Sequence, residues 1–171
     1  MTKKRKIGII IVSVLIVLTL GFIWANSLLD MSRSAQESGF VYNATMNVVE
    51  AVAGKPSADV LRGVITISVF RDMAHGFEFA LLGVEIFILY VLVKRYSYIR
   101  IPEILCLGLL VAGIDECLQM LSDRVASFAD VMIDFLGFVL AVGLSVLIKF
   151  LFDLKKKRSG QNKENLKEEK I

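Results

Sequence analysis

The chain carries a long apolar run near its N-terminus, from Ile7 to Trp24, which follows the basic residues Lys3–Lys6 and contains no charged side chain. About 20 apolar residues in a helix are enough to cross the hydrocarbon core of a bilayer. A cleaved secretory signal shares the basic start and apolar middle, but no clear small-x-small cleavage site follows this run. We therefore expect an uncleaved membrane helix over 7–24, with Trp24 at the interface, where aromatic rings are enriched.

Three further apolar segments follow and predict spans at about 73–93, 104–121 and 131–152. Hydrophobic residues make up 56% of the chain, more than the roughly half that is usual in soluble domains. Pro102 suits the start of the third span, because the first turn of a helix leaves its N–H groups unpaired in any case. The expected fold class is therefore all-α, a polytopic membrane protein with four transmembrane helices.

The basic residues are distributed unevenly between the connections. Most of them lie at the N-terminus, in the 94–103 turn and from Lys149 onward. The 25–72 loop and the 122–130 turn hold few: Arg33, Lys55, Arg62, Arg71 and Arg124. Because cytoplasmic loops carry the excess of Lys and Arg, we expect a multi-pass protein of the cell membrane with both termini cytoplasmic and the 25–72 loop outside.

The 25–72 loop has amphipathic patterning of its own. Valines recur at helical spacing from Val41 to Val52, and a second such stretch runs to Phe70 from Ser57 or Asp59 as a possible N-cap. We expect two short helices lying on the outer membrane surface. Residues 1–158 then form the membrane domain, whereas the charged cytoplasmic tail 159–171 has almost no apolar content and is expected to be disordered.

The polar residues at the outer ends of the last three spans share one level in this topology. At a rise of 1.5 Å per residue they all fall within roughly 10 Å of the outer interface. Within each span they are spaced three or four apart and so lie on one helix face; the pairs are His75–Glu78, Asp115–Gln119, Glu116–Gln119 and Asp130–Asp134. Because a charged side chain is costly in lipid, these residues are expected to face a shared polar pocket.

Other interpretations stay open for several of these acids. Asp130 is equally an N-cap of the fourth span, favoured by the helix dipole, and Asp123 suits a solvated turn. Glu78, Asp115 and Glu116 form either a functional pocket or structural hydrogen bonds between helices. Glu85 lies near mid-membrane, where we expect it to be protonated and bonded to a neighbouring helix, through Ser13, Thr19 or Ser145.

Several short motifs occur together in a fixed order along the chain. They are Asn26-Ser27-Leu28 with Ser34 and Ser38, then Arg71-Asp72-Met73-Ala74-His75-Gly76-Phe77-Glu78, then Asp115-Glu116-Cys117-Leu118-Gln119, followed by Arg124, Asp130 and Gly137. In these motifs and its four spans the chain resembles the VanZ-like family of bacterial membrane proteins. It departs from the family at Asp134, where Asn is frequent, and at Gly76, where an aromatic residue commonly follows the His.

The resemblance implies a cell-envelope role and, in some members, reduced susceptibility to teicoplanin-like lipoglycopeptides. The first hypothesis is therefore a non-enzymatic protein whose pocket binds a membrane lipid, a lipid-linked wall precursor or a lipoglycopeptide. Arg71 and Arg124 suit a phosphate, although acids beside it would need protons, a bridging cation or a displaced position. The expected ligand-binding residues are Arg71, His75, Glu78, Asp115, Glu116, Gln119, Arg124, Asp130 and Asp134.

The second hypothesis is an enzyme acting on such a lipid. Its candidate catalytic residues are His75, Glu78, Asp115 and Glu116, with one carboxylate and His75 as general acid and base. A divalent cation on His75, Glu78 and Glu116 is a variant of this idea; no other cofactor is expected. A small transporter is a third possibility, although no internal repeat supports it. Nucleic acid is not an expected partner.

Overall fold

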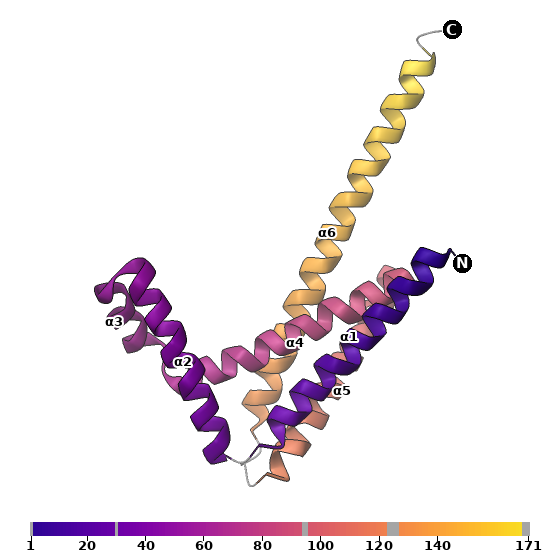
Figure 1. Ribbon diagram of the computed structural model, residues 1–171. Coiled ribbons are helices and arrows are strands. Elements are labelled where there is room, and N and C mark those ends of the chain that lie inside the picture. The colour runs from indigo at the N-terminus through magenta and orange to yellow at the C-terminus, as the bar shows by residue number, and fades with distance from the viewer. Residues whose placement is uncertain (1, 30, 94–95, 123–126, 169–171) are drawn as a thin grey trace.

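A computed structural model of the chain describes residues 2–29, 31–93, 96–122 and 127–168, with backbone alone at 31–35 and 159–168 (Figure 1). Every element in the described residues is helical, which confirms the all-α fold class. The elements are α1 (Lys3–Ser27), α2 (Met31–Ala53), α3 (Lys55–Val64), α4 (Ile67–Leu92), the 3₁₀ turn η1 (Tyr98–Arg100), α5 (Ile101–Met120) and α6 (Phe128–Glu168).

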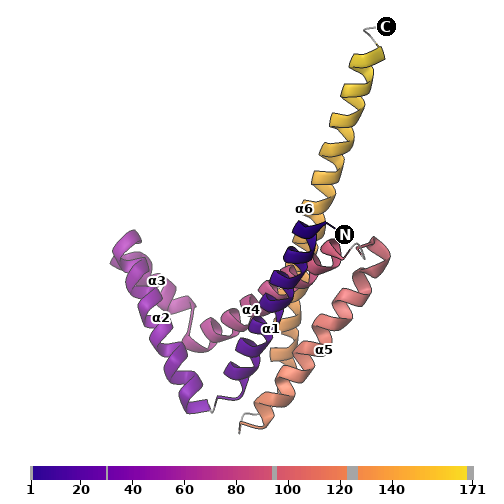
Figure 2. The same ribbon diagram turned by 45° about the vertical axis from the view of Figure 1, so that its right-hand side comes forward.

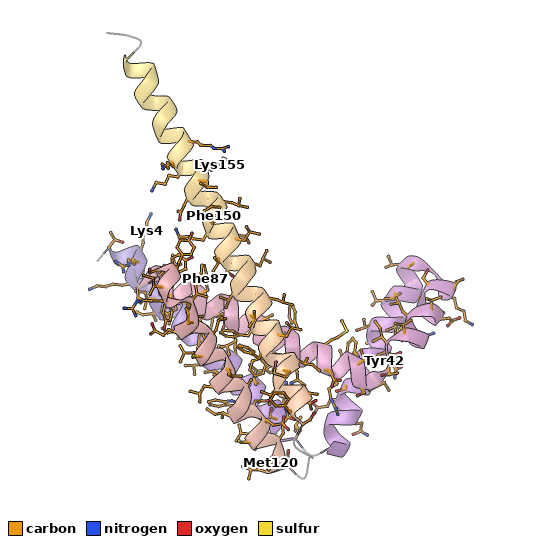
Figure 3. The ribbon with its side chains drawn as sticks, turned by 180° about the vertical axis from the view of Figure 1, so that it is seen from behind. Lys4, Tyr42, Phe87, Met120, Phe150 and Lys155 are labelled. Carbon is orange, nitrogen blue, oxygen red and sulfur yellow. The ribbon has the colours of Figure 1, made fainter. Side chains whose placement is uncertain are left out.

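Four of these helices, α1, α4, α5 and α6, pack together as a bundle. The C-terminal ends of α1 and α5 lie beside the beginning of α6 in both views (Figures 1 and 2). The helices α2 and α3 form a separate hairpin that reaches the bundle through the first half of α4. Lys4 and Lys155 lie toward one end of the molecule and Met120 at the other (Figure 3).

Three helices in the described residues are long and apolar enough to cross a membrane: Lys3–Ser27, Ile67–Leu92 and Phe128–Arg158. The structure therefore supports three of the four expected spans. The difference lies in α5, which has the length of a span. Any stretch of α5 long enough to cross contains three acids, Glu103, Asp115 and Glu116, and so its composition alone does not identify it as a span.

The 25–72 loop differs from the expectation in its boundaries. The first loop helix, α2, has 23 residues and is not short. The second, α3, starts at Lys55 rather than at Ser57 or Asp59, because Gly54 takes a positive φ of 84° and allows a direct reversal out of α2. The segment after Val64 belongs to α4, whose start is capped by the Thr66 side chain accepting from Val69 N at 3.3 Å.

The C-terminal segment also differs from the expectation. We expected disorder after Arg158, whereas α6 continues as a helix to Glu168 and extends beyond the bundle (Figure 2). Lys, Glu and Gln make up half of residues 159–168 and have high intrinsic helix propensity, which favours a continued helix without an apolar face.

The core of the bundle is centred on the contact between α4 and α6. Phe138 is fully buried there, with Phe79 and Leu82 from α4. A Cβ at Gly108 of α5 would overlap the Phe138 ring, so this glycine makes room for it. Apolar side chains on the outside of the bundle are exposed, for example Leu18 at 63%, as expected for a protein surrounded by lipid.

The closest approach of α4 and α6 occurs at Gly76 and Gly137. A Cβ built on Gly137 would fall against the carbonyl oxygen and Cα of Gly76. Small residues allow helix backbones to approach this closely in membrane bundles. The pair therefore fixes the height at which the two helices cross.

We predict that Gly137→Ala lowers the free energy of unfolding by about 1–3 kcal/mol, because the added methyl group forces the two backbones apart. Gly143→Ala on the same helix is the control, since a Cβ there meets nothing within 4 Å. Thermal unfolding in a mild detergent gives the unfolding midpoints of both variants. Equal midpoints for the two variants would show that the crossing is not tightly packed.

Candidate functional site

Asp115 is the most completely bonded of the predicted site residues. Its Oδ1 accepts from Ser27 Oγ at 2.5 Å and its Oδ2 from Gln119 Nε2 at 2.9 Å. Asp115 and Ser27 are both fully buried. Ser122 of the following turn donates to the Ser27 carbonyl at 2.9 Å. These bonds join the C-terminal ends of α1 and α5, so Asp115 has a structural role.

Glu116 holds the beginning of α6. Its Oε1 accepts a hydrogen bond from the backbone N–H of Ser127 at 2.5 Å. Ser127 Oγ in turn accepts a capping hydrogen bond from the backbone N–H of Asp130 at 3.4 Å. The capping side chain is therefore Ser127 and not Asp130. Asp130 remains in the first turn of α6, where a helix dipole favours an acid.

Asp134 lies deeper on α6 and is 3% exposed. It makes no hydrogen bond within the described residues. Four other acids lie close enough to act on it electrostatically: Asp115, Asp130, Glu78 and Glu116. The acids of α4, α5 and α6 thus gather around one end of the bundle.

A small hollow adjoins these acids between α4 and α6. It is lined by Asp72, His75, Gln119, Asp130, Ile133 and Asp134, with a volume of about 10 Å³. That volume is about the size of one water molecule. The hollow can hold a solvent molecule but no organic ligand.

A larger cavity of about 320 Å³ lies on the other side of His75, between the end of α1, α2 and the first half of α4. One part of its lining is polar: Asn26, Glu37, Ser38, Arg71, His75 and Glu78. The rest is apolar: Phe22, Leu29, Val41, Phe70 and Ala74. We call this space the amphipathic cavity, since its lining suits a molecule with a polar head and an apolar tail.

Glu78 and Arg71 are the charged residues that α4 contributes to the amphipathic cavity. Glu78 Oε1 accepts from Asn26 Nδ2 at 3.2 Å, and Glu78 Oε2 lies 3.8 Å from His75 Nδ1. Arg71 Nε lies 3.7 Å from Oδ1 of its neighbour Asp72. Both separations exceed hydrogen-bond length but are short enough for electrostatic attraction within each pair.

Glu85 lies one heptad after Glu78, inside the bundle and away from both hollows. Its Oε1 accepts from Thr19 Oγ1 at 3.0 Å, and the residue is 7% exposed. The expected bond to a neighbouring helix is thus present, with Thr19 as the donor.

The structure divides the predicted site residues into three groups. Asp115, Glu116 and Gln119 form hydrogen bonds that hold the helix ends together, whereas Arg71, His75 and Glu78 line the amphipathic cavity. Asp130 and Asp134 line the small hollow. Arg124, like Asp123, lies outside the described residues.

Sequence reasoning missed the contribution of α2. Glu37 lines the cavity from this helix, and its spacing of four residues from Val41 places both on one helix face. Asn26 was part of a quoted motif but not a candidate site residue. The pattern of α2 alone does not reveal that this face meets α4.

Within the described part of the chain, no three His, Cys, Asp or Glu side chains are grouped as ligands for a metal ion. The set His75, Glu78 and Glu116 is therefore not assembled around one point: Glu116 is engaged at Ser127, and Glu78 lies at the amphipathic cavity.

Comparison with protein families identifies the chain. The sequence model of the VanZ/LLP1 family matches residues 10–149. The chain belongs to the VanZ/LLP1 family. The match covers most of the chain and includes all residues that line the amphipathic cavity. Searches of curated proteins and of solved structures gave no match. Together with the three apolar helices, family membership identifies a membrane protein.

We predict that Ser27→Ala lowers the free energy of unfolding by about 1–3 kcal/mol, because Asp115 Oδ1 then remains buried without its donor. Ser13→Ala on the same helix is the control; Ser13 lines an apolar surface groove of α1 and should change the free energy by less than about 0.5 kcal/mol. Denaturant-induced unfolding in detergent measures the free energy of unfolding of both variants. A Ser27 variant as stable as the Ser13 variant would exclude a structural role for this bond.

Proposed function

We propose that this VanZ-like protein crosses the cell membrane four times, with α5 as the third span along the chain and both termini in the cytoplasm. The burial of Asp115 and Glu116 supports α5 as a span, because lipid then meets its apolar face rather than its acids. The positions of Lys4 and Lys155 toward the end opposite Met120 support the orientation (Figure 3).

In this orientation the amphipathic cavity opens in the outer half of the membrane. Its function is to bind a cell-envelope lipid, a lipid-linked wall precursor or a lipoglycopeptide, and so to reduce susceptibility to teicoplanin-like antibiotics. The observation that carries the proposal is the mixed lining of the cavity: a charged group from Arg71, His75 and Glu78 beside an apolar wall from Phe22, Leu29 and Val41.

The two parts of the lining suit the two parts of an amphiphile. The guanidinium of Arg71 offers a fork of donors that fits phosphate. Phe22 and Val41 are 58% and 51% exposed, so the apolar wall is continuous with the surface that faces lipid. A lipid can therefore enter from the side, with its tail remaining in the membrane.

A specific observation also favours an enzyme as the second candidate. His75 lines both the small hollow and the amphipathic cavity and lies 3.8 Å from Glu78 Oε2. In that position it can take the proton of a water molecule that attacks a lipid phosphate in the cavity, and it can return that proton to the lipid alcohol as the P–O bond to that alcohol breaks. Release of product from the bound lipid distinguishes this candidate from simple binding.

We predict that Glu78→Gln and His75→Ala remove the protection against teicoplanin that the chain confers on a susceptible bacterial host. Glutamine preserves the size of the side chain but loses its charge, and alanine removes the imidazole. Glu85→Gln is the matched control, because Glu85 lies on the same helix, away from the amphipathic cavity, and accepts a hydrogen bond from Thr19. The measurement is the minimal inhibitory concentration, with protein amounts in the membrane compared by immunoblotting.

The variants should fall to the level of the empty vector, with Glu85→Gln unchanged. Full protection by both cavity variants at equal membrane amounts would contradict a role for the amphipathic cavity.

A further inference from the structure

Two buried polar atoms, on residues that line the amphipathic cavity, have no hydrogen-bond partner within the described residues. They are Arg71 Nε, a donor, and Glu78 Oε2, an acceptor. Buried polar groups in folded proteins are nearly always paired, because an unpaired one keeps its full desolvation cost. These two atoms carry opposite charges, so a ligand that pairs both must present an anionic acceptor and a cationic donor.

The charges around the two atoms lead to the same requirement. Glu37 and Glu78 both line the cavity, and their negative charges oppose a headgroup that carries only phosphate. Arg71 in turn opposes a headgroup that carries only an amine. A zwitterionic headgroup avoids both conflicts, since its phosphate and its ammonium each meet the opposite charge.

We propose that the amphipathic cavity recognises a lipid whose headgroup carries both a phosphate and a primary ammonium, the chemistry of phosphatidylethanolamine. This inference rests on the proposed function and specifies its ligand. The phosphate pairs with Arg71, while the ammonium pairs with Glu78 Oε2 and Glu37. Asn26 holds the other oxygen of Glu78 at 3.2 Å and so orients the carboxylate.

The spacing along α4 fits a short headgroup. Arg71 and Glu78 are seven residues apart, which places them on one helix face at a separation of about 10 Å along the axis. Two long side chains and one headgroup can bridge that distance. The acyl chains then lie against Phe22, Leu29 and Val41, which a soluble phosphoethanolamine would leave uncovered.

The test is native mass spectrometry of the full-length protein in mild detergent. Equal amounts of phosphatidylethanolamine and phosphatidylglycerol with identical acyl chains, a polyprenyl phosphate and teicoplanin are offered in separate and pairwise mixtures. We expect the ethanolamine lipid to be retained about tenfold over the glycerol lipid, the worth of one charge-assisted hydrogen bond.

Variants of the cavity residues show which side chains cause the preference for the ethanolamine lipid. Glu78→Gln and Glu37→Gln should each bring the ratio of the two lipids close to one, and Arg71→Gln should weaken the retention of both. Glu50→Gln and Arg62→Gln are the matched controls, because Glu50 and Arg62 pair with each other at 3.3 Å outside the cavity. Glu37 is exposed on α2, so its variant remains informative even where Glu78→Gln fails to fold.

The outcomes separate this inference from the function on which it rests. Equal retention of the two lipids by the wild type, or an unchanged preference in both Glu variants, overturns the headgroup assignment and leaves lipid binding in place. Retention of none of the four compounds removes the proposed function as well. Displacement of the lipid by an equal concentration of soluble phosphoethanolamine identifies a soluble ligand and also overturns the assignment.

Discussion

The close approach of α4 and α6 at Gly76 and Gly137 positions everything else at this end of the bundle. Because Gly137 has no side chain, its backbone can lie against the carbonyl of Gly76, where a Cβ on Gly137 would overlap that oxygen. His75, next to Gly76, is thereby brought to the small hollow beside Asp130 and Asp134. The same crossing leaves the opposite side of α4 open toward α2, where the amphipathic cavity forms.

The second constraint is the cost of placing acids within an apolar bundle. Two hydrogen bonds offset the cost of burying Asp115, and a hydrogen bond from Ser127 at the start of α6 offsets the cost of burying Glu116. Glu78 offsets this cost only in part, since one of its oxygens is bonded to Asn26 and the other is buried without a hydrogen-bond partner within the described residues. Glu85 Oε2 is likewise buried without a hydrogen-bond partner within the described residues. The position of Glu78 in the lining of the amphipathic cavity therefore distinguishes it from Glu85 as a residue available to a ligand.

Hydropathy and the helical period predicted much of this arrangement. They predicted the helices at 7–24, 73–93 and 131–152, and they indicated that acids of separate helices lie at the same depth in the bundle. They could not show which acids bond to which partners, because a periodic pattern gives a face of a helix but not the neighbour that it meets. Glu37 shows the limit most clearly, since it contributes to the cavity only through the packing of α2 against α4.

The most direct test of the account is the side of the membrane to which the amphipathic cavity opens. Ser38 lines that cavity, and Ser97 lies before η1 at the opposite end of the bundle. Each is replaced by Cys in a chain whose exposed free cysteines, Cys106 and Cys117, are Ala, and a membrane-impermeant maleimide is added to intact cells. The account predicts labelling at position 38 in intact cells and at position 97 only after permeabilisation. The reverse pattern would place the cavity on the cytoplasmic side and contradict the proposed function.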